Sequence, residues 1–241
     1  MKRSIDVFAS SQSFREEDIR DKLVIVIDVL RACSTIHTAL ENGAAGIIPV
    51  AEGDDPGRFT RNLDAGRLLL CGEKDGKKVE GFHLGNSPLE YGKDAVNQKI
   101  LIFKTSNGTR AITRSHLAQK IIIGSFLNLT VLVNFLKKNP HLNVKMICSG
   151  WKNRLSIEDL LCAGAITYHL FDKKIPPDAA DGVKVAFGLY EKFGRDVSGL
   201  IRSSNHGNRL RELGFDEDIR YCSQVDLFQT IPAMTDGVIK I

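Results

Sequence analysis

The sequence predicts an α/β protein with three layers (α/β/α), in which helices cover both faces of a mainly parallel sheet. The first observation is an alternation of short β-branched apolar runs with longer stretches at helical spacing, typical of parallel α/β folds. The second is residues 23–27, a continuous run of Leu, Val and Ile that indicates a strand buried on both faces. A polar loop follows, and Ile36, Ala39 and Leu40 then recur at helical spacing before Gly43, which ends the helix.

The other regular elements follow from the same two patterns. Strands are expected at residues 4–8, 45–50, 68–71, 99–103, 121–124 and 143–148. Helices are expected at residues 58–65, 111–118, 127–138, 157–170, 178–192 and 197–203. Ser156 caps the helix at 157–170, and Glu158 and Asp159 in its first turn favour its dipole.

The remaining segments are less regular. Residues 12–21 are expected to form a loop or short helix, 53–57 a turn, 219–227 a short strand around a turn, and 230–241 an extended tail. Residues 75–92 are rich in turn formers, and a long loop inside a compact domain is usually functional or mobile.

Length and charge narrow the class of protein. The 241 residues suit one domain at 1–241, with a lobe boundary near 125–145 as the alternative. The net charge of +4 is mild, and basic pairs such as Lys77–Lys78 have no interleaved aromatic residues. These pairs indicate solvated faces, so no nucleic-acid partner is expected. A small anionic substrate suits a weakly positive protein, and assembly into a homo-oligomer is left open.

Neither a membrane partner nor a disulfide framework is expected. No apolar run approaches the roughly 20 residues that span a bilayer, and residues 1–8 lack the apolar core of a signal peptide. Five cysteines without CxxC spacing favour reduced thiols, the cytoplasm as location, and no structural zinc. Cys162 belongs to an apolar helix face, and Cys148 lacks the arginine five residues later that a tyrosine-phosphatase loop requires, so both thiols are predicted to be structural.

Polar groups follow several of the predicted strands. Asp28 ends the strand at 23–27 and Glu73 ends the strand at 68–71, while residues 105–110 and the stretch from Ser149-Gly150 to Glu158-Asp159 follow two more. The carboxyl ends of parallel strands share one edge of a sheet, and ligands bind there. We therefore expect an active site at this edge.

The stretch after Asp28 also carries a guanidinium and two hydroxyls, those of Arg31, Ser34 and Thr35. These groups near a helix N-terminus suit a metal ion and a bound anion. The alternative is that Asp28 only caps the loop and that Arg31 is a surface charge.

Residues 105–110, Thr-Ser-Asn-Gly-Thr-Arg, have the chemistry of an anion cradle. Gly108 can adopt a positive φ that turns successive N–H groups toward one point. Thr105, Asn107 and Thr109 offer side-chain donors, and Arg110 offers a two-pronged one. The alternative is an ordinary Asn-Gly turn.

Asp28, Glu73 and Glu158 offer hard oxygen ligands, and Mg²⁺ usually takes one or two carboxylates together with waters and phosphate oxygens. No HExxH, EF-hand or Walker A sequence competes for the metal. Leu30 stands where a haloacid-dehalogenase-type phosphatase has its second acid, which argues against Asp28 as a nucleophile. His206, expected in an exposed loop, is either an acid–base group or a surface histidine.

Taken together and in order, these motifs resemble the 2-phosphosulfolactate phosphatases, the ComB family. The resemblance rests on Asp28-Val-Leu-Arg-Ala, Gly72-Glu73, residues 81–90 (GFHLGNSPLE), residues 105–109 (TSNGT) and residues 156–164 (SIEDLLCAG), followed by Cys222, Asp226 and Ile231-Pro232. It implies a Mg²⁺-dependent hydrolase that converts 2-phospho-3-sulfolactate to 3-sulfolactate and phosphate, a step toward coenzyme M in methanogens.

The sequence departs from the family pattern at Cys33, His83, Lys104 and Ser106. A phosphatase of another small anionic phosphomonoester therefore remains an alternative. A non-catalytic anion-binding protein on the same scaffold is a second one, and whether hydrolysis is covalent or direct stays open.

Roles follow from the residues and the resemblance together. Catalysis is expected from Asp28, Arg31, Glu73 and Glu158, with Mg²⁺ held by Asp28 and by Glu73 or Glu158. Substrate binding is expected from Ser34, Thr35, Asn86, Ser87, Thr105, Asn107, Gly108, Thr109, Arg110 and His206.

Overall fold

A computed structural model describes residues 3–51, 53–54 and 65–241. The strands are β1 (Ile5–Phe8), β2 (Leu23–Ile27), β3 (Gly46–Pro49), β4 (Leu68–Lys74), β5 (Lys77–Lys78), β6 (Ile100–Lys104), β7 (Lys120–Gly124), β8 (Val144–Cys148), β9 (Ala233–Thr235) and β10 (Val238–Lys240). The helices are α1 (Glu16–Ile19), α2 (Ala32–Glu41), α3 (Lys93–Val96), α4 (Gly108–Arg114), α5 (Leu129–Lys138), α6 (Ile157–Leu170), α7 (Asp181–Phe193), α8 (Val197–Ser203), α9 (Asn205–Glu212) and α10 (Asp216–Cys222).

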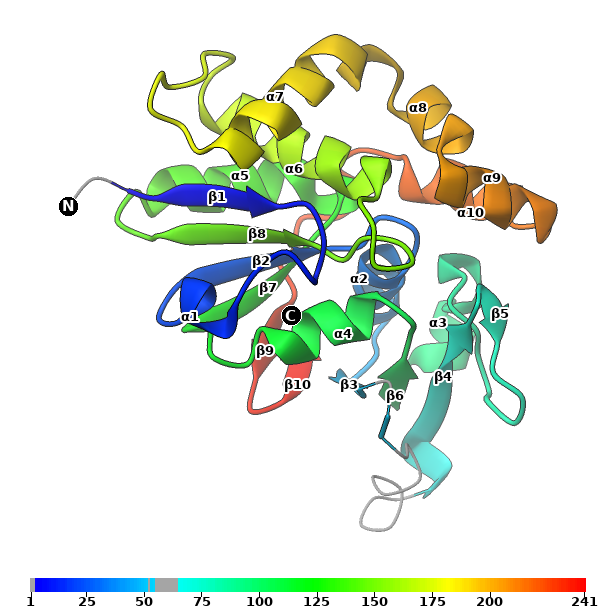
Figure 1. The fold of residues 1–241 in the computed structure, drawn as a ribbon. Coiled ribbons are helices and arrows are strands. Elements are labelled where there is room, and N and C mark those ends of the chain that lie inside the picture. The colour runs from blue at the N-terminus through cyan, green and yellow to red at the C-terminus, as the bar shows by residue number, and fades with distance from the viewer. Residues whose placement is uncertain (1–2, 52, 55–64) are drawn as a thin grey trace.

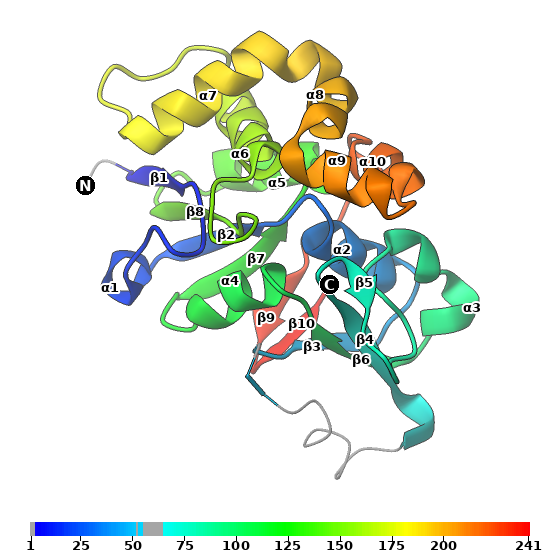
Figure 2. The same cartoon turned by 45° about the vertical axis from the view of Figure 1, so that its right-hand side comes forward.

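The three-layer α/β architecture is confirmed. One sheet has the strand order β1-β8-β2-β7-β9-β10-β3-β6-β4-β5, and most of its neighbours pair in parallel. Helices α5, α6 and α7 cover one face, while α1 and α4 lie on the other (Figures 1 and 2). No helix in the part of the chain that the structure describes is long and apolar enough to cross a membrane.

Strand β2 shows why the apolar run 23–27 has no polar face. Its residues alternate between two cores: Leu23, Ile25 and Ile27 pack with α5 and α6, whereas Val24 and Val26 pack with α2 and α4. All five side chains are buried, and the strand pairs in parallel with both β7 and β8. The strand is therefore central, and its carboxyl end opens directly onto the edge where Asp28 lies.

The expected tail at 230–241 is extended, but it is also part of the sheet. β9 and β10 form an antiparallel hairpin between β7 and β3, two strands of the parallel sheet that are not otherwise neighbours (Figure 1). Asp236 and Gly237 connect the two strands, with φ of 50° and 77°. Positive φ at both turn residues is the signature of a two-residue type I′ hairpin, and Asp-Gly is its common sequence.

Two expectations for the last third are changed by the structure. The predicted strand at 219–227 is wrong, because Asp216–Cys222 forms helix α10 with Asp216, Glu217 and Asp218 favouring the dipole of its first turn. His206 is not in a loop either: Ser204 caps helix α9 by accepting a hydrogen bond from the Gly207 N–H at 2.8 Å. The expected helix at 58–65 and most of the turn at 53–57 lie outside the described residues.

The buried side chain of the β9–β10 hairpin is expected to contribute to the free energy of unfolding. Ile239 is fully buried in the core with α2, and it forms the bridge from β10 to Ile47 of β3. We expect Ile239→Ala to lower the free energy of unfolding by roughly 2–5 kcal/mol in urea titrations, because the cavity cannot collapse fully. The matched control is Ile241→Ala, two residues further and 58% exposed, with an expected change within about 0.5 kcal/mol. Equal small effects would mean that the hairpin is not integral to the sheet.

Candidate active site

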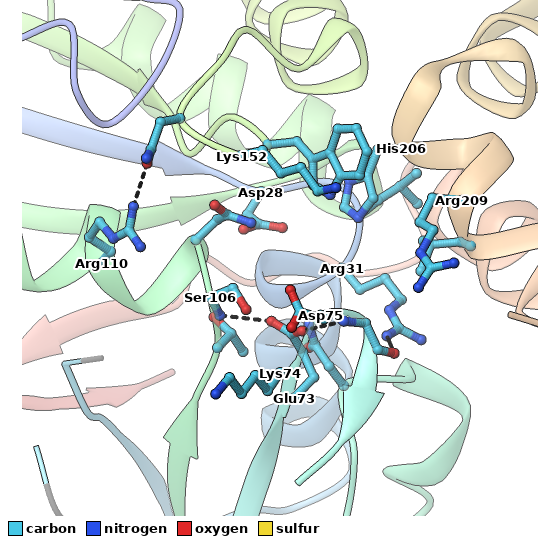
Figure 3. A pocket seen from close by; sticks show the side chains of 18 residues that line it. Asp28, Arg31, Glu73, Lys74, Asp75, Ser106, Arg110, Lys152, His206 and Arg209 are labelled. Carbon is cyan, nitrogen blue, oxygen red and sulfur yellow. Dashed lines mark hydrogen bonds between the residues drawn. The ribbon is translucent and has the colours of Figure 1, made fainter. Parts of the chain in front are cut away.

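A cavity of about 620 Å³ lies where the carboxyl ends of β2, β4, β6 and β8 meet helix α9 (Figure 3). It is lined by Asp28, Leu30, Arg31, Glu73, Lys74, Asp75, Gly76, Asn86, Thr105, Ser106, Asn107, Arg110, Trp151, Lys152, Asn153, His206, Arg209 and Leu210. The strand ends singled out in the sequence therefore do meet around one space. The lining mixes carboxylates with several basic side chains, as a polyanionic ligand bound with a cation would require.

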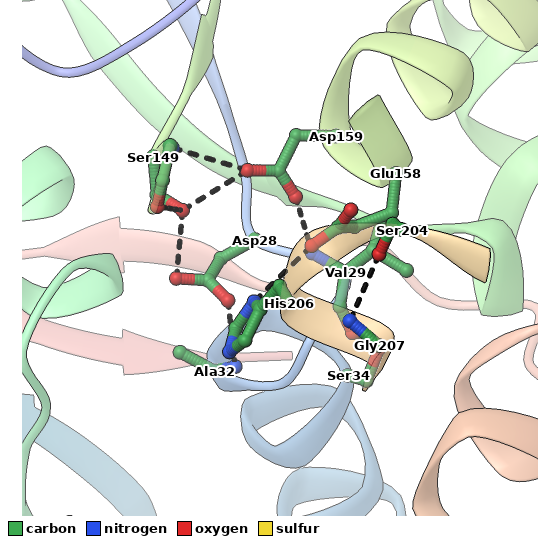
Figure 4. A network of polar contacts seen from close by, with 11 residues as sticks. Asp28, Val29, Ala32, Ser34, Ser149, Glu158, Asp159, Ser204, His206 and Gly207 are labelled. Atoms are coloured by element: carbon green, nitrogen blue, oxygen red, sulfur yellow. Dashed lines mark hydrogen bonds and ion pairs between the residues drawn. The ribbon is translucent and has the colours of Figure 1, made fainter. Parts of the chain in front are cut away.

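Asp28 is fixed in this cavity by two hydrogen bonds. Its Oδ1 accepts from the Ala32 N–H at 3.0 Å and its Oδ2 from the Ser149 hydroxyl at 2.8 Å (Figure 4). The side chain is almost fully buried, and burial raises its pKa. The hydrogen bond from Ser149 and the charge of His206 lower that pKa, and the charge of Glu73 raises it. Burial has the largest effect, so the pKa of Asp28 is raised overall.

Glu73 is held from two sides. Its Oε1 accepts from the Ser106 N–H and its Oε2 from the Gly76 N–H, both at 2.7 Å. Gly72 brings β4 close enough to β6 for this, because a Cβ there would lie 1.8 Å from the Lys104 carbonyl oxygen and φ is +145°. Figure 3 shows Asp28 above and Glu73 below the cavity.

Thr105, Asn107 and Arg110 line the cavity, but Gly108 does not have the expected positive φ. Helix α4 begins at Gly108, earlier than the expected helix at 111–118. Gly108 is instead required for close packing, because a Cβ would lie 2.4 Å from the Ala32 Cβ and 2.7 Å from the Asp28 Oδ2. Gly108 therefore belongs to the site because it packs against Asp28, and not because its backbone adopts a positive φ.

The Thr109 side chain supports this turn from behind. Its hydroxyl donates to the Thr105 carbonyl at 2.8 Å, while the Thr105 Oγ1 accepts from the Thr109 N–H at 3.1 Å. Thr109 is fully buried and does not line the cavity. Arg110 donates from Nη1 to the Oδ1 of Asn153, another lining residue, at 2.6 Å.

Arg31 lines the cavity but is committed to a buried ion pair. Its Nη1 lies 2.6 Å from the Asp218 Oδ2, its Nη2 donates to the Gly76 carbonyl at 2.9 Å, and its guanidinium lies 4.2 Å from the centre of the Phe215 ring. The Ser87 hydroxyl donates to the other oxygen of Asp218 at 2.6 Å. The alternative of Arg31 as a surface charge is wrong, since its side chain is 2% exposed.

Two other hydroxyls from the sequence set also serve the scaffold. Ser34 donates to the Val29 carbonyl at 2.9 Å, and Thr35 donates to the Asn86 carbonyl at 2.8 Å. Neither lines the cavity, whereas Asn86 does, and its buried Oδ1 has no hydrogen-bond partner among the described residues. Thr35 thus holds the loop that brings Asn86 to the site.

Glu158 does not line the cavity of Asp28 and Glu73. Its Oε1 lies 3.1 Å from the His206 Nδ1, and its side chain is 1% exposed. Within residues 3–51, 53–54 and 65–241, no three His, Cys, Asp or Glu side chains are placed to hold one metal ion. The expected ligand set of Asp28, Glu73 and Glu158 is therefore not assembled, because the Glu158 carboxylate turns toward α9.

Several site residues were not predicted from the sequence. Lys74 directly follows Glu73, and Lys152 lies inside the stretch from Ser149 to Glu158, so a search of all polar residues near the strand ends finds both. Arg209 gave no signal, since α9 was not expected as a helix. Asp159 accepts from the Val29 N–H at 2.8 Å, and its Oδ2 lies 3.1 Å from the Ser149 hydroxyl that donates to Asp28.

The cysteines are all buried free thiols. Burial raises the pKa of Cys148 and of Cys162, and nearby Asp159 raises both further. A catalytic thiol needs a lowered pKa and access to solvent. These two residues have the opposite properties, as expected for structural thiols.

Fold and site together define an α/β protein with a cavity at the carboxyl edge of its sheet, lined by carboxylates and basic side chains. The family model described as 2-phosphosulpholactate phosphatase matches residues 8–237. A probable 2-phosphosulfolactate phosphatase of Caldanaerobacter subterraneus subsp. tengcongensis is 36% identical over 236 residues, 98% of this chain and 97% of that protein. Proteins of the same description from Pseudothermotoga lettingae and Thermotoga maritima are 42% and 40% identical, covering 88% and 90% of this chain and 89% and 91% of their own. The chain belongs to the 2-phosphosulfolactate phosphatase family, and with it to the phosphoric monoester hydrolases.

The contact between Gly108 and Asp28 yields a prediction. Gly108→Ala forces Ala32 or the Asp28 carboxylate to move, and a displacement of this size at a reacting centre costs about 10- to 100-fold in kcat. Turnover is measured by phosphate release, and folding by thermal melting. The control is Gly188→Ala on α7, where a Cβ meets nothing within 4 Å, with unchanged turnover expected. Full turnover of Gly108→Ala would mean that this packing does not set the position of Asp28.

Proposed function

We propose that this protein hydrolyses 2-phospho-3-sulfolactate to 3-sulfolactate and phosphate with Mg²⁺. The observation that carries the proposal is the charge pattern of the cavity, where carboxylates lie among the basic side chains of Lys74, Arg110, Lys152 and Arg209, while the charge of Arg31 is paired with Asp218. The substrate has three anionic groups, phosphate, sulfonate and carboxylate, so a site for it needs separate cationic donors. Relatives described as probable 2-phosphosulfolactate phosphatases over nearly the whole chain support the same substrate.

The residues of the cavity fit a Mg²⁺ ion that takes some of its ligands from the protein and the others from water and substrate. Asp28 and Glu73 offer hard oxygens to one cavity, and neither forms an ion pair with a Lys, Arg or His among the described residues. Each has lone pairs left, because each of its oxygens accepts only one hydrogen bond. Mg²⁺ with one or two carboxylates keeps places for water and phosphate oxygens, and it supplies charge neutralisation at the phosphoryl group.

The chain's own groups then hold the substrate. Donors of Thr105, Asn107 and Arg110 surround the phosphoryl group beside Asp28. Lys152 and Arg209 on the facing wall bind the anionic groups that do not react (Figure 3). The arrangement aims positive charge at phosphate oxygens whose charge shifts during transfer, which is the main contribution a protein makes to phosphoryl transfer.

Three of the four departures from the family pattern do not line the cavity. Lys104 donates to the Asp54 carbonyl at 2.9 Å, the His83 Nδ1 accepts from the Leu70 N–H at 2.9 Å, and Cys33 is fully buried in α2. Only Ser106 lines the cavity. The departures therefore give little reason to prefer another phosphomonoester. The five free thiols support the cytoplasm as the proposed location.

The substrate assignment is tested with three phosphate esters on one enzyme preparation. We expect kcat/KM to fall in steps from phosphosulfolactate to phospholactate, which lacks the sulfonate, and then to p-nitrophenyl phosphate. Each lost charge-assisted hydrogen bond is worth roughly 1.5–3 kcal/mol, or about ten- to a hundredfold. Equal efficiency on all three substrates would leave a general phosphatase, and no phosphate release from any would leave an anion-binding protein.

The metal assignment is tested by removal and by substitution. Activity is expected to vanish in EDTA and to return with Mg²⁺. Asp28→Asn keeps the shape but removes a charge that a hard cation needs, so we expect kcat to fall about a hundredfold or more. Asp236→Asn, in the hairpin turn, is the matched control with unchanged turnover. Full activity of metal-free enzyme, or normal turnover of Asp28→Asn, would contradict the assignment.

A further inference from the structure

His206 has the setting of an acid–base group rather than of a simple binding residue. It lies in the first turn of α9, and its ring stacks on Trp151 with centroids 5.3 Å apart and planes at 15°. The side chain is 15% exposed and lines the cavity that also contains Asp28. Stacking and the capped helix start fix the plane of the ring, so its two nitrogens have defined directions.

One of these nitrogens is occupied by a buried carboxylate. The His206 Nδ1 lies 3.1 Å from the Glu158 Oε1 (Figure 4). Burial alone would raise the pKa of Glu158, but the hydrogen bond and charge of His206 outweigh it, so the pKa is lowered and the group is ionised. An ionised carboxylate only accepts hydrogen bonds, so Nδ1 carries a proton.

The other nitrogen points away from Glu158. Nδ1 and Nε2 lie on different sides of an imidazole ring, and no residue in the described part of the chain hydrogen-bonds to the His206 Nε2. Since His206 lines the cavity, Nε2 is the atom available to a ligand there. Nδ1 faces Glu158, so a proton given to a ligand in the cavity comes from Nε2, and Asp28, Lys152 and Arg209 are charged groups that line the same cavity.

We propose that His206 is the acid that protonates the leaving group, and that Glu158 is the positioning residue that orients it. The inference rests on the proposed phosphatase reaction. Water oxygen bonds to phosphorus while the ester P–O bond breaks, leaving its electron pair on the C2 oxygen of the substrate. The His206 Nε2–H gives its proton to that oxygen, and a proton from the attacking water restores Nε2–H through solvent. The products are the alcohol and hydrogen phosphate.

The decisive variant is His206→Asn, whose amide can still meet Glu158 but cannot supply a proton. With phosphosulfolactate, whose alkoxide leaving group needs the proton, we expect kcat to fall about 10²- to 10⁴-fold. With p-nitrophenyl phosphate, whose phenolate leaves as a stable anion, the loss is expected to stay below about tenfold. The affinity for 3-sulfolactate, measured by calorimetry, is expected to change less than about threefold.

Glu158→Gln tests the positioning role in the same assays. It is expected to lower kcat for phosphosulfolactate by about tenfold or more, and the double variant with His206→Asn is expected to be no worse than His206→Asn alone. His116→Asn, a histidine with 56% of its side chain exposed, is the matched control with unchanged kinetics. All variants are compared by thermal melting, so that a folding defect is seen separately.

The outcomes separate this inference from the proposed function. Wild-type enzyme that releases no phosphate from phosphosulfolactate would remove the proposed function. Active wild-type enzyme with equal losses on the two substrates in His206→Asn, or with product affinity that falls along with kcat, would overturn the role of His206. Additive losses in the double variant would overturn the positioning role of Glu158.

Discussion

The carboxylate of Asp159 joins the segments that form the site. It accepts from the Val29 N–H at 2.8 Å, after β2, and from the Gly150 N–H at 3.2 Å, after β8, while lying in the first turn of α6. The Ser149 hydroxyl lies between Asp159 and Asp28, so the position of Asp28 depends on that of Asp159 (Figure 4). Burial and the charges of Asp28 and Glu158 raise the pKa of Asp159. The cluster of carboxylates is thus unfavourable on its own, and the cation proposed beside Asp28 would relieve the repulsion.

The opposite wall depends on a second buried charge, that of Asp218. It binds Arg31 from the loop after β2 and Ser87 from the long loop at 75–92, so α10 connects both segments from the far end of the chain. Through Arg31 the same network reaches the Gly76 carbonyl beside Glu73. The buried carboxylates of Asp159 and Asp218 therefore hold together the segments that carry the catalytic and binding groups.

Part of the fold and of the site could be predicted from local sequence patterns. The apolar run of β2 and the polar residues at strand ends predicted the sheet and the edge where Asp28, Glu73 and Thr105 lie, because both signals are short-range. Partnerships across the chain were not predictable: His206 is 48 residues from Glu158, and Asp218 is 187 residues from Arg31. Helix α9 was missed because its polar sequence buries only Gly207 and Leu210. The hairpin was missed although Asp236-Gly237 is a strong local turn signal.

The central claim is that hydrolysis takes place in the cavity between Asp28 and Glu73. A crystal structure of the full chain with Mg²⁺ and 3-sulfolactate tests it most directly. We expect an ion beside Asp28 and Glu73, with the sulfonate and carboxylate of the product beside Lys152 and Arg209. Product bound in the adjoining cavity that Arg154, Ser156 and Glu158 line, with no ion at Asp28, would contradict it.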